Sequence, residues 1–210
     1  MMPGSSGVKL TRDFYLSHDV RSCARQLLGK YLCTLFDGVP SAGMITETEA
    51  YAGITDRASH AWNGRNTART SVMYRTGGTA YVYLCYGVHH LFNVVTNVEG
   101  TPDAVLVRGI YPVTGLEIIS RRTGKTTLNW ESGYGPGKVS KSLGINTSHS
   151  SYDLLGNVIW IEDRGFNPGP GEIITGRRIG VEYAGEDALL PYRFTLRKDC
   201  FQTRDDKSYF

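Results

Sequence analysis

The chain has 210 residues, of which 40% are hydrophobic and 20% charged, with a formal net charge of +3 and a mean hydropathy of −0.26. These values exclude a fibrous or disordered protein and are typical of one large folded domain with a substantial core. The mildly basic charge permits a polyanionic partner such as nucleic acid without requiring one.

The sequence carries no signal for export, membrane insertion or a cysteine-bound metal. The N-terminus lacks the apolar segment of a signal peptide, and the longest apolar stretch, residues 81–95, is too short and too polar to span a bilayer. The four cysteines are widely spaced and contain no C-x-x-C pair. We therefore expect a protein that is not secreted and has free thiols, no metal and no cofactor.

The N-terminal part divides into a leader and a helix. Residues 1–11 are rich in Gly and Ser and are expected to form a flexible leader, so that a single domain spans residues 12–210. Ser17 can cap a helix whose apolar positions follow helical spacing as far as Leu28. Gly29 is a suitable residue to end it.

Two predicted strands follow, and the second carries aligned polar groups. Residues 31–36 and 42–51 flank an Asp-Gly pair, which favours a tight turn. Because residues i and i+2 of a strand share a face, Glu47, Glu49 and Tyr51 would project together. Two carboxylates beside a tyrosine indicate either a solvated sheet edge or the floor of a polar cleft.

A long irregular segment precedes a second predicted hairpin. Residues 52–78 contain many Gly, Asn, Thr, Ser and Arg residues, and a loop of this length in a compact domain is typically functional or disordered. Residues 79–86 and 88–96 are predicted strands around Gly87. Tyr86 would therefore lie at the tip of the hairpin.

The C-terminal half is predicted to contain a buried strand, two short helices and further strands. Residues 103–110 are almost continuously apolar apart from Arg108. Thr114 and Glu117 have capping-box spacing, and residues 135–138 (Gly-Pro-Gly-Lys) can open a helix whose free amides suit a phosphate. Hairpins dominate the pattern, so we expect an α+β fold: one mixed domain with a curved, mostly antiparallel sheet flanked by short helices.

The residues singled out above form an ordered set that resembles the alkyladenine (3-methyladenine, or methylpurine) DNA glycosylase family. The resemblance extends from about Leu27 to residues 192–194 and covers nearly all of the chain except the leader and tail. The motifs that carry it are Glu49-Ala50-Tyr51, His60, residues 81–87, Asn93, Arg108 and Gly135-Pro136-Gly137-Lys138.

The resemblance implies excision of alkylated or deaminated purines from duplex DNA after the nucleotide has been flipped out of the stack. Substrates of this class include 3-methyladenine, 7-methylguanine, hypoxanthine and ethenoadenine. By the same resemblance, Glu49 is the general base that activates water and Arg108 helps to hold that water. No lysine matches a Schiff-base nucleophile, which implies a monofunctional enzyme that leaves an abasic site.

The family pattern also implies how the flipped base is held. Tyr51 would lie on one face of the base, with His60 and Tyr83 on the other, and Asn93 would disfavour the exocyclic amino group of guanine. Tyr86 would enter the minor groove and fill the gap in the stack.

Contacts with the DNA backbone are implied for four further residues, Arg65, Thr67, Gly137 and Lys138. The expected partner is double-stranded DNA containing damaged purines, bound by a monomer. The expected location follows the DNA: the cytoplasm and nucleoid of a bacterium, or the nucleus of a eukaryote.

Two other functions fit part of the sequence. A glycoside hydrolase could use Glu47 and Glu49 as an acid/base pair, because carboxylates at i and i+2 lie roughly 6–7 Å apart. That alternative leaves Tyr86 and Asn93 unexplained. A nucleic-acid-binding module without catalysis would use the same groove and predicts that Glu49→Gln has no effect.

Overall fold

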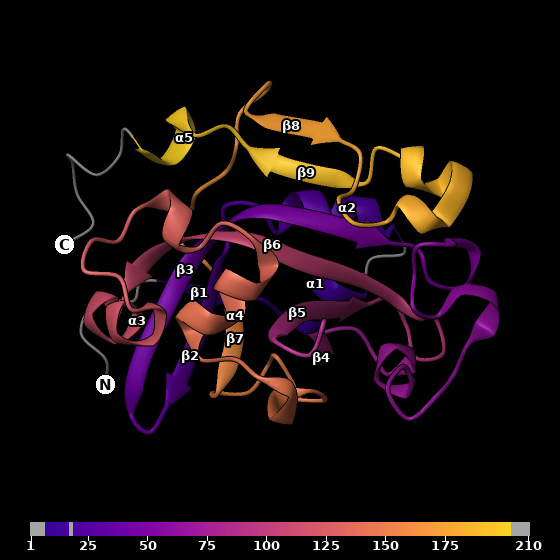
Figure 1. The fold of residues 1–210 in the computed structure, drawn as a ribbon, viewed down its shortest axis with the longest axis horizontal. Helices are drawn as coiled ribbons and strands as arrows, with labels where there is room; N and C mark the ends of the chain where they lie inside the picture. Colours follow the sequence, from indigo (N-terminus) through magenta and orange to yellow (C-terminus); the bar gives the residue numbers. More distant parts are fainter. Residues whose placement is uncertain (1–6, 17–18, 203–210) are drawn as a thin grey trace.

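A curved antiparallel sheet runs through the computed structural model, which describes residues 7–16 and 19–202 (Figure 1). The order along the sheet is β1-β7-β2-β3-β6-β5-β4, and β9 pairs with both β3 and β8. All strand pairings in this part of the chain are antiparallel. The strands are β1 (Val8–Lys9), β2 (Tyr31–Phe36), β3 (Val39–Tyr51), β4 (Ala80–Cys85), β5 (His89–Thr96), β6 (Asp103–Thr114), β7 (Ile159–Asp163), β8 (Ile173–Gly176) and β9 (Arg193–Leu196).

The strand β3 organises this sheet, because it pairs along its length with β6 and, in successive halves, with β2 and β9. Its register with β6 shifts on both sides of Glu47. Such bulges bend a strand and increase its twist, which accounts for the curvature. Residues 41–50 are all buried, so other elements cover both faces of β3.

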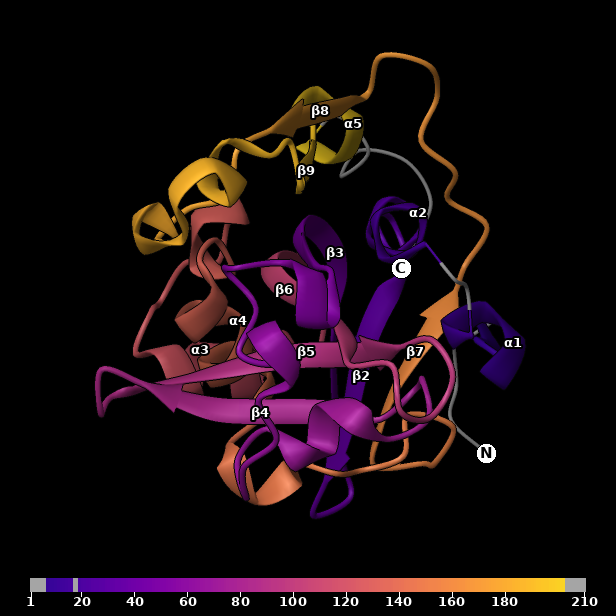
Figure 2. The ribbon, with the colours of Figure 1, turned by 90° about the vertical axis from the view of Figure 1, so that its right-hand side faces the viewer.

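Helices cover the central sheet from two sides. Figure 2 shows α3 and α4 on one side of β3 and β6, and α2 on the other. The predicted α+β class, with a mostly antiparallel sheet and short flanking helices, is confirmed. The helices are α1 (Arg12–Tyr15), α2 (Val20–Gln26), α3 (Leu116–Thr123), α4 (Pro136–Leu143) and α5 (Asp199–Gln202), with 3₁₀ turns η1 (Gly53–Thr55), η2 (Trp62–Gly64), η3 (Ser71–Tyr74), η4 (Trp130–Ser132), η5 (Thr147–His149) and η6 (Glu182–Leu189).

The N-terminal segment differs from its sequence prediction. Residues 1–6 of the predicted leader, and the predicted cap Ser17, lie outside the described residues. β1 pairs with the outer edge of β7, whose backbone groups would otherwise have no strand partner. The chain therefore joins the sheet within residues 8–11, before the predicted leader ends. Asp19 caps α2, its side chain accepting a hydrogen bond from the Arg21 amide.

One of the two later helices begins differently from its sequence prediction. Thr114 does not cap α3, because pairing with β3 extends β6 to Thr114 and leaves Gly115, at φ 69°, to turn the chain into the helix. α4 begins at Pro136 as predicted. Left-handed glycines, Gly124 and Gly144, follow the two helices.

The long segment 52–78 is folded onto the sheet. It contains η1, η2 and η3, and its Val72 and Met73 pack with Tyr81 and Val95 in a small apolar cluster separate from the main core. The cluster holds this segment beside β4 and β5. The segment 52–78 thereby forms one side of a cavity.

Candidate active site

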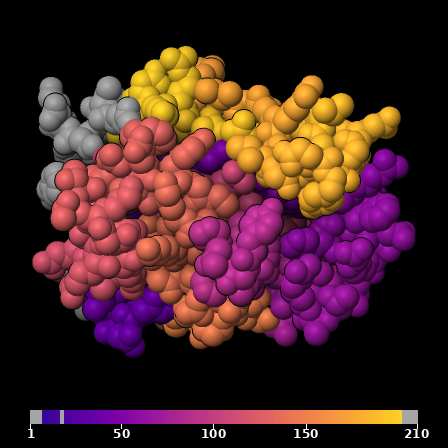
Figure 3. Space-filling view, in the orientation of Figure 1, coloured from indigo at the N-terminus to yellow at the C-terminus, as the bar shows by residue number. Residues whose placement is uncertain are grey.

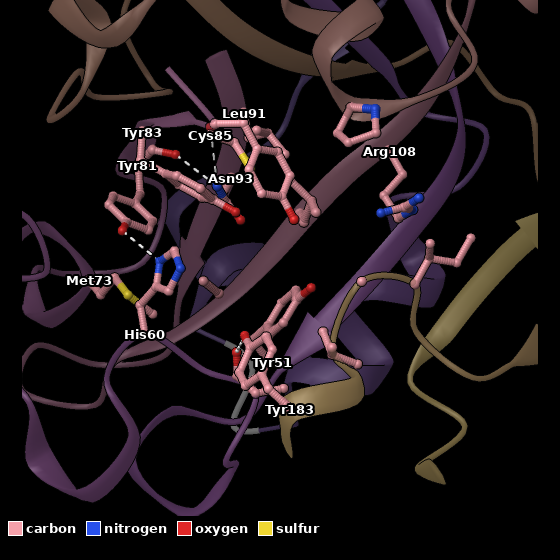
Figure 4. Close-up of a pocket in the computed structure, with 18 residues that line it drawn as sticks. Tyr51, His60, Met73, Tyr81, Tyr83, Cys85, Leu91, Asn93, Arg108 and Tyr183 are labelled. Atoms are coloured by element: carbon pink, nitrogen blue, oxygen red, sulfur yellow. Dashed lines mark hydrogen bonds between the residues drawn. The ribbon is translucent and has the colours of Figure 1, made fainter. Parts of the chain in front are cut away.

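A cavity of about 240 Å³ lies where the end of β3, the β4–β5 hairpin, the segment 52–78 and residues 179–183 meet. Figure 4 shows aromatic side chains arranged around it, with Tyr51 and Tyr183 adjacent and His60 beside Tyr81. Aromatic walls with a few convergent polar groups are typical of a ligand site. Six of the predicted site residues line this cavity: Tyr51, His60, Tyr83, Tyr86, Asn93 and Arg108.

Glu49 lies directly behind the cavity wall and is fully buried. Its Oε2 accepts hydrogen bonds from the Tyr51 hydroxyl at 2.9 Å and from Arg108 Nη1 at 3.4 Å. Its Oε1 accepts one from the backbone amide of Ile179 at 2.7 Å. Tyr51, Arg108 and Ile179 all line the cavity, so the carboxylate lies one layer beneath its surface.

Burial raises the pKa of Glu49 above its ordinary value. The Arg108 charge, the Ile179 amide and the Tyr51 hydroxyl each oppose this rise, while neighbouring Glu47 adds to it. A carboxyl group with a raised pKa and a specific cationic neighbour, next to a cavity, is a strong candidate for acid–base chemistry.

Glu47 is also buried, which excludes the exposed role considered from the sequence. The covering residue is on β9: Arg193 Nη1 donates to Glu47 Oε1 at 3.1 Å. Arg108 Nε lies between the two carboxylates, 3.6 Å from Glu47 and 3.4 Å from Glu49. This nitrogen makes no hydrogen bond within the described part of the chain. Glu47 is therefore a fixed counterion beside the site.

His60 is oriented by its tyrosine neighbours. Its Nδ1 lies 2.9 Å from the Tyr81 hydroxyl, and its ring meets that of Tyr83 edge to face, with centroids 4.6 Å apart. Burial lowers the pKa of His60 to about 4, and the positive charges of Arg69 and Arg65 lower it further. His60 is therefore a neutral, fixed part of the wall near pH 7.

Asn93 is buried in β5 and also lines the cavity. Its Nδ2 donates to the backbone carbonyls of Tyr81 at 3.1 Å and Leu91 at 3.3 Å. These two acceptors satisfy the amide nitrogen and fix the orientation of the side chain. The asparagine that interrupts an apolar strand is thus held by the sheet itself.

Tyr86 lies at the tip of the β4–β5 hairpin and is 92% exposed. Tyr86 and Gly87 have φ values of 50° and 72°, and the Val88 amide donates to the Cys85 carbonyl, as around the two central residues of a type I′ turn. In Figure 3 the magenta atoms of this hairpin stand near the centre of the visible face. The exposure excludes a core role for this tyrosine.

The four predicted phosphate-binding residues lie outside the cavity lining. Arg65 and Thr67 are exposed, and the Thr67 hydroxyl accepts a hydrogen bond from the Thr70 amide. Lys138 Nζ donates to the carbonyl of Glu131 at 3.3 Å. Gly137 is in the first turn of α4, whose first residue, a proline, lines the cavity.

The sequence analysis missed the segment 177–183. Ile179 supplies the amide that binds Glu49, and Tyr183 lines the cavity while its hydroxyl donates to the Ala58 carbonyl at 3.1 Å. Arg178 is fully buried and forms an ion pair with Asp56. These contacts join residues more than 120 positions apart, so the local sequence contains no signal for them.

The described residues contain no group of three or more His, Cys, Asp or Glu side chains arranged to hold a metal ion. No helix in the same part of the chain has the length and apolar character needed to cross a membrane.

Comparison with known proteins gives a consistent result. The family model described as methylpurine-DNA glycosylase (MPG) matches residues 13–200. A protein of Chlamydia pneumoniae is 43% identical over 188 residues, covering 89% of this chain and 94% of its own length. Relatives from Clostridium acetobutylicum (39% identical, covering 90% and 95%) and Anaeromyxobacter dehalogenans (43% identical, covering 94% and 87%) are similar over as much of the chain. All three carry the printed name "Putative 3-methyladenine DNA glycosylase".

Proposed function

Because the chain belongs to the methylpurine-DNA glycosylase family, we propose that it excises alkylated or deaminated purines from duplex DNA by hydrolysing the N-glycosidic bond. The substrates are of the 3-methyladenine, 7-methylguanine, hypoxanthine and ethenoadenine class. The observation that carries this proposal is the buried carboxylate of Glu49, bound by three donors that themselves form the wall of an aromatic cavity.

Glu49 acts as the general base in this mechanism. Above its raised pKa the carboxylate removes a proton from the water that attacks C1′ as the bond to the base breaks, and its charge stabilises the oxocarbenium-like sugar. Arg108 holds the water, since it both lines the cavity and carries a buried Nε without a hydrogen-bond partner in the described structure. Water reaches the carboxylate when the bound nucleotide opens the hydrogen bond between Arg108 and Glu49, because catalytic hydrogen bonds often rearrange on substrate binding.

The enzyme is proposed to be monofunctional. In the part of the chain that the structure describes, no lysine lines the cavity, so no amine is available there to form a Schiff base with the sugar. The product is an abasic site in an uncut strand. The proposed mechanism uses no cofactor, and we propose that the enzyme acts as a monomer.

The flipped base is proposed to occupy the aromatic cavity. A volume of about 240 Å³ is below the roughly 300–1,000 Å³ of drug-sized ligand sites, which suits a single planar base better than an oligosaccharide. Tyr51 packs against one face, and His60 and Tyr83 against the other, where their π-systems attract a positively charged alkylated purine. The amide of Asn93, held by two backbone carbonyls, cannot move aside for the exocyclic amino group of guanine.

Binding of the duplex is proposed to use the surface around the cavity mouth. Tyr86 fills the gap left by the flipped nucleotide, as its exposed position at the tip of the β4–β5 hairpin permits. Arg65, Thr67, Lys138 and the Gly137 backbone bind phosphates, and we place the enzyme where the cell keeps its DNA.

The test is incubation of the purified protein with a labelled duplex that contains one hypoxanthine or ethenoadenine, followed by alkali. We expect alkali-dependent cleavage at the lesion, which Glu49→Gln strongly reduces and the matched surface variant Glu117→Gln retains. Cleavage without alkali would contradict the monofunctional mechanism, and absence of cleavage for several alkylated purines would contradict the enzyme.

The two alternatives make different predictions in the same experiment. A binding module predicts that Glu49→Gln changes nothing. A glycoside hydrolase needs Glu47 as a reacting group, but Glu47 is bound by Arg193 and does not line the cavity. Hydrolysis of oligosaccharides with no action on DNA would favour that alternative.

A further inference from the structure

A buried ion pair lies beside the proposed site and has no role in the mechanism above. The guanidinium of Arg178 and the carboxylate of Asp56 have side-chain exposures of 0% and 1%, and they form a two-point contact through Nη1–Oδ2 and Nη2–Oδ1. Buried ion pairs add little net stability compared with apolar side chains of similar size, because both charges lose their hydration. Stability alone therefore does not account for this pair.

The pair connects three segments of the chain. Arg178 Nη1 also donates to the carbonyl of Ala50 at the end of β3, and Nη2 to the carbonyl of Asp187 in η6, both at 3.0 Å. Asp56 accepts hydrogen bonds from the backbone amides of Ala52 at 3.1 Å and Ala58 at 2.9 Å. The end of β3, the start of the segment 52–78 and η6 are thus fixed relative to one another at a single point.

The Arg178–Asp56 pair lies next to two of the groups that donate hydrogen bonds to Glu49. The Arg178 guanidinium lies over the ring of Tyr51, 4.9 Å from its centroid, and Tyr51 donates its hydroxyl to Glu49. The next residue, Ile179, donates its amide to the other carboxylate oxygen of Glu49. Two of the three donors to Glu49 are therefore directly connected to Arg178, one through ring contact and one through the backbone.

We propose that the Arg178–Asp56 pair is a positioning element that holds the Tyr51 ring and the Ile179 amide against Glu49. The inference rests on the proposed glycosylase function, because it assigns the pair a role in preparing the general base. Loss of the pair lets residues 177–181 move away from β3 and leaves Glu49 with fewer donors. The reacting carboxylate is then misplaced as well as more basic.

The sign of the change in the pKa of Glu49 in Asp56→Asn distinguishes a positioning role from a direct electrostatic effect of the Asp56 charge. The titratable and charged groups that face Glu49 are Glu47, Tyr51 and Arg108, with Tyr83 and Arg178 acting from farther away. Removal of the Asp56 negative charge would by itself favour the ionised form of Glu49 and lower its pKa. Loss of the Ile179 amide and the Tyr51 hydroxyl would raise that pKa, since both bonds lower it. The two mechanisms therefore predict opposite signs.

The first measurement is a ¹³C NMR titration of the Glu49 side-chain carboxyl in the free protein, assigned by comparison with Glu49→Gln. We expect the apparent pKa of Glu49 to rise in Asp56→Asn and to remain unchanged in Asp163→Asn, which disrupts the partly buried Lys30–Asp163 pair away from the cavity. A fall, or no change, in Asp56→Asn overturns the proposal. This measurement needs no activity, so it decides the positioning role even if the protein excises no base.

The second measurement keeps the proposal testable if Asp56→Asn does not fold. The double variant Asp56→Leu/Arg178→Met replaces the pair by apolar side chains and leaves no unpaired buried charge. We expect its single-turnover excision rate to fall by about 10- to 100-fold, because a displacement of a catalytic group by about 1 Å lowers a rate by this order. Its Kd for a duplex with a stable abasic-site analogue should stay within about threefold of the wild-type value. A rate equal to that of the wild type, or a loss confined to DNA binding, overturns the positioning role.

Discussion

Tyr86 combines a strained backbone with an exposed side chain, and Tyr86→Asn is expected to separate stability from function. An L-residue in the left-handed region costs about 1–2 kcal/mol, whereas asparagine tolerates it and Asn-Gly is a preferred type I′ pair. The native φ is 50°, and the tyrosine ring is 92% exposed, so few contacts are lost. The free energy of unfolding should therefore rise by about 1 kcal/mol, or roughly 2–4 °C in Tm for a chain of this size.

The same substitution should weaken capture of the lesion. Stacking of an aromatic side chain on a base contributes about 1–3 kcal/mol, so the loss of this stacking corresponds to a roughly 5- to 150-fold decrease in kcat/KM for excision. The assays are thermal or denaturant unfolding of the free protein and kcat/KM on a duplex with one ethenoadenine. Tyr152→Asn, which alters a partly exposed tyrosine outside the cavity, serves as the control.

Two results would refute this reasoning. A decrease in unfolding free energy of more than about 1 kcal/mol would show that the Tyr86 ring packs against the protein, since a solvated surface position typically changes stability by less than 0.5 kcal/mol. Unchanged kcat/KM in a correctly folded variant would show that the ring does not enter the duplex.

Further predictions concern the remaining site residues. Glu49→Gln should lower the excision rate by about 10²- to 10⁴-fold, the usual contribution of a general base. It should also raise Tm at pH 7: the folded pKa of Glu49 lies above its unfolded value, so the ionised carboxylate costs stability at neutral pH, and this cost disappears as the pH falls below the unfolded pKa. The Tm difference from the wild type should accordingly shrink on acidification, and a constant difference would contradict the linkage. The acidic limb of the wild-type pH–rate profile should lie above the ordinary pKa of a glutamate; a limb at or below that value would argue against Glu49 as the base. Asn93→Ala should increase excision of undamaged guanine relative to hypoxanthine, measured by competition between two labelled duplexes, and an unchanged ratio would exclude Asn93 from discrimination. Lys138→Ala should reduce the slope of log Kd against log salt concentration by about one, as loss of a single phosphate contact does, whereas an unchanged slope would remove Lys138 from the interface.

Local chemistry allowed correct prediction of those features that depend on neighbouring residues. The β4–β5 hairpin and the start of α4 at Pro136 follow from turn propensities and helix capping, which act over a few residues. Alternation within β3 also brought Glu47 and Glu49 together, and both lie within 4 Å of Arg108. The strand period was therefore enough to predict that the two carboxylates lie side by side.

The burial of these carboxylates could not be predicted, because the covering groups come from distant parts of the chain. Arg193 of β9 binds Glu47 from 146 residues away, and the Ile179 amide binds Glu49 from 130 residues away. An amide donor has no side-chain signature at all. The capping prediction at Thr114 was wrong for a related reason, since pairing with β3 extended β6 past the local helix signal.

The position of β3 in the sheet has a consequence for hydrogen exchange. The stretch around Glu47 and Glu49 is flanked by β6 on one side and β9 on the other, so its amides should exchange only when the whole sheet opens, near the free energy of global unfolding. Part of the cavity wall, residues 58–73 and 179–183, consists of short 3₁₀ turns and irregular segments, whose amides should exchange through smaller openings. The proposed general base should thus lie in the slowest-exchanging part of the sheet, while the proposed nucleotide-binding surface should open without disturbing it.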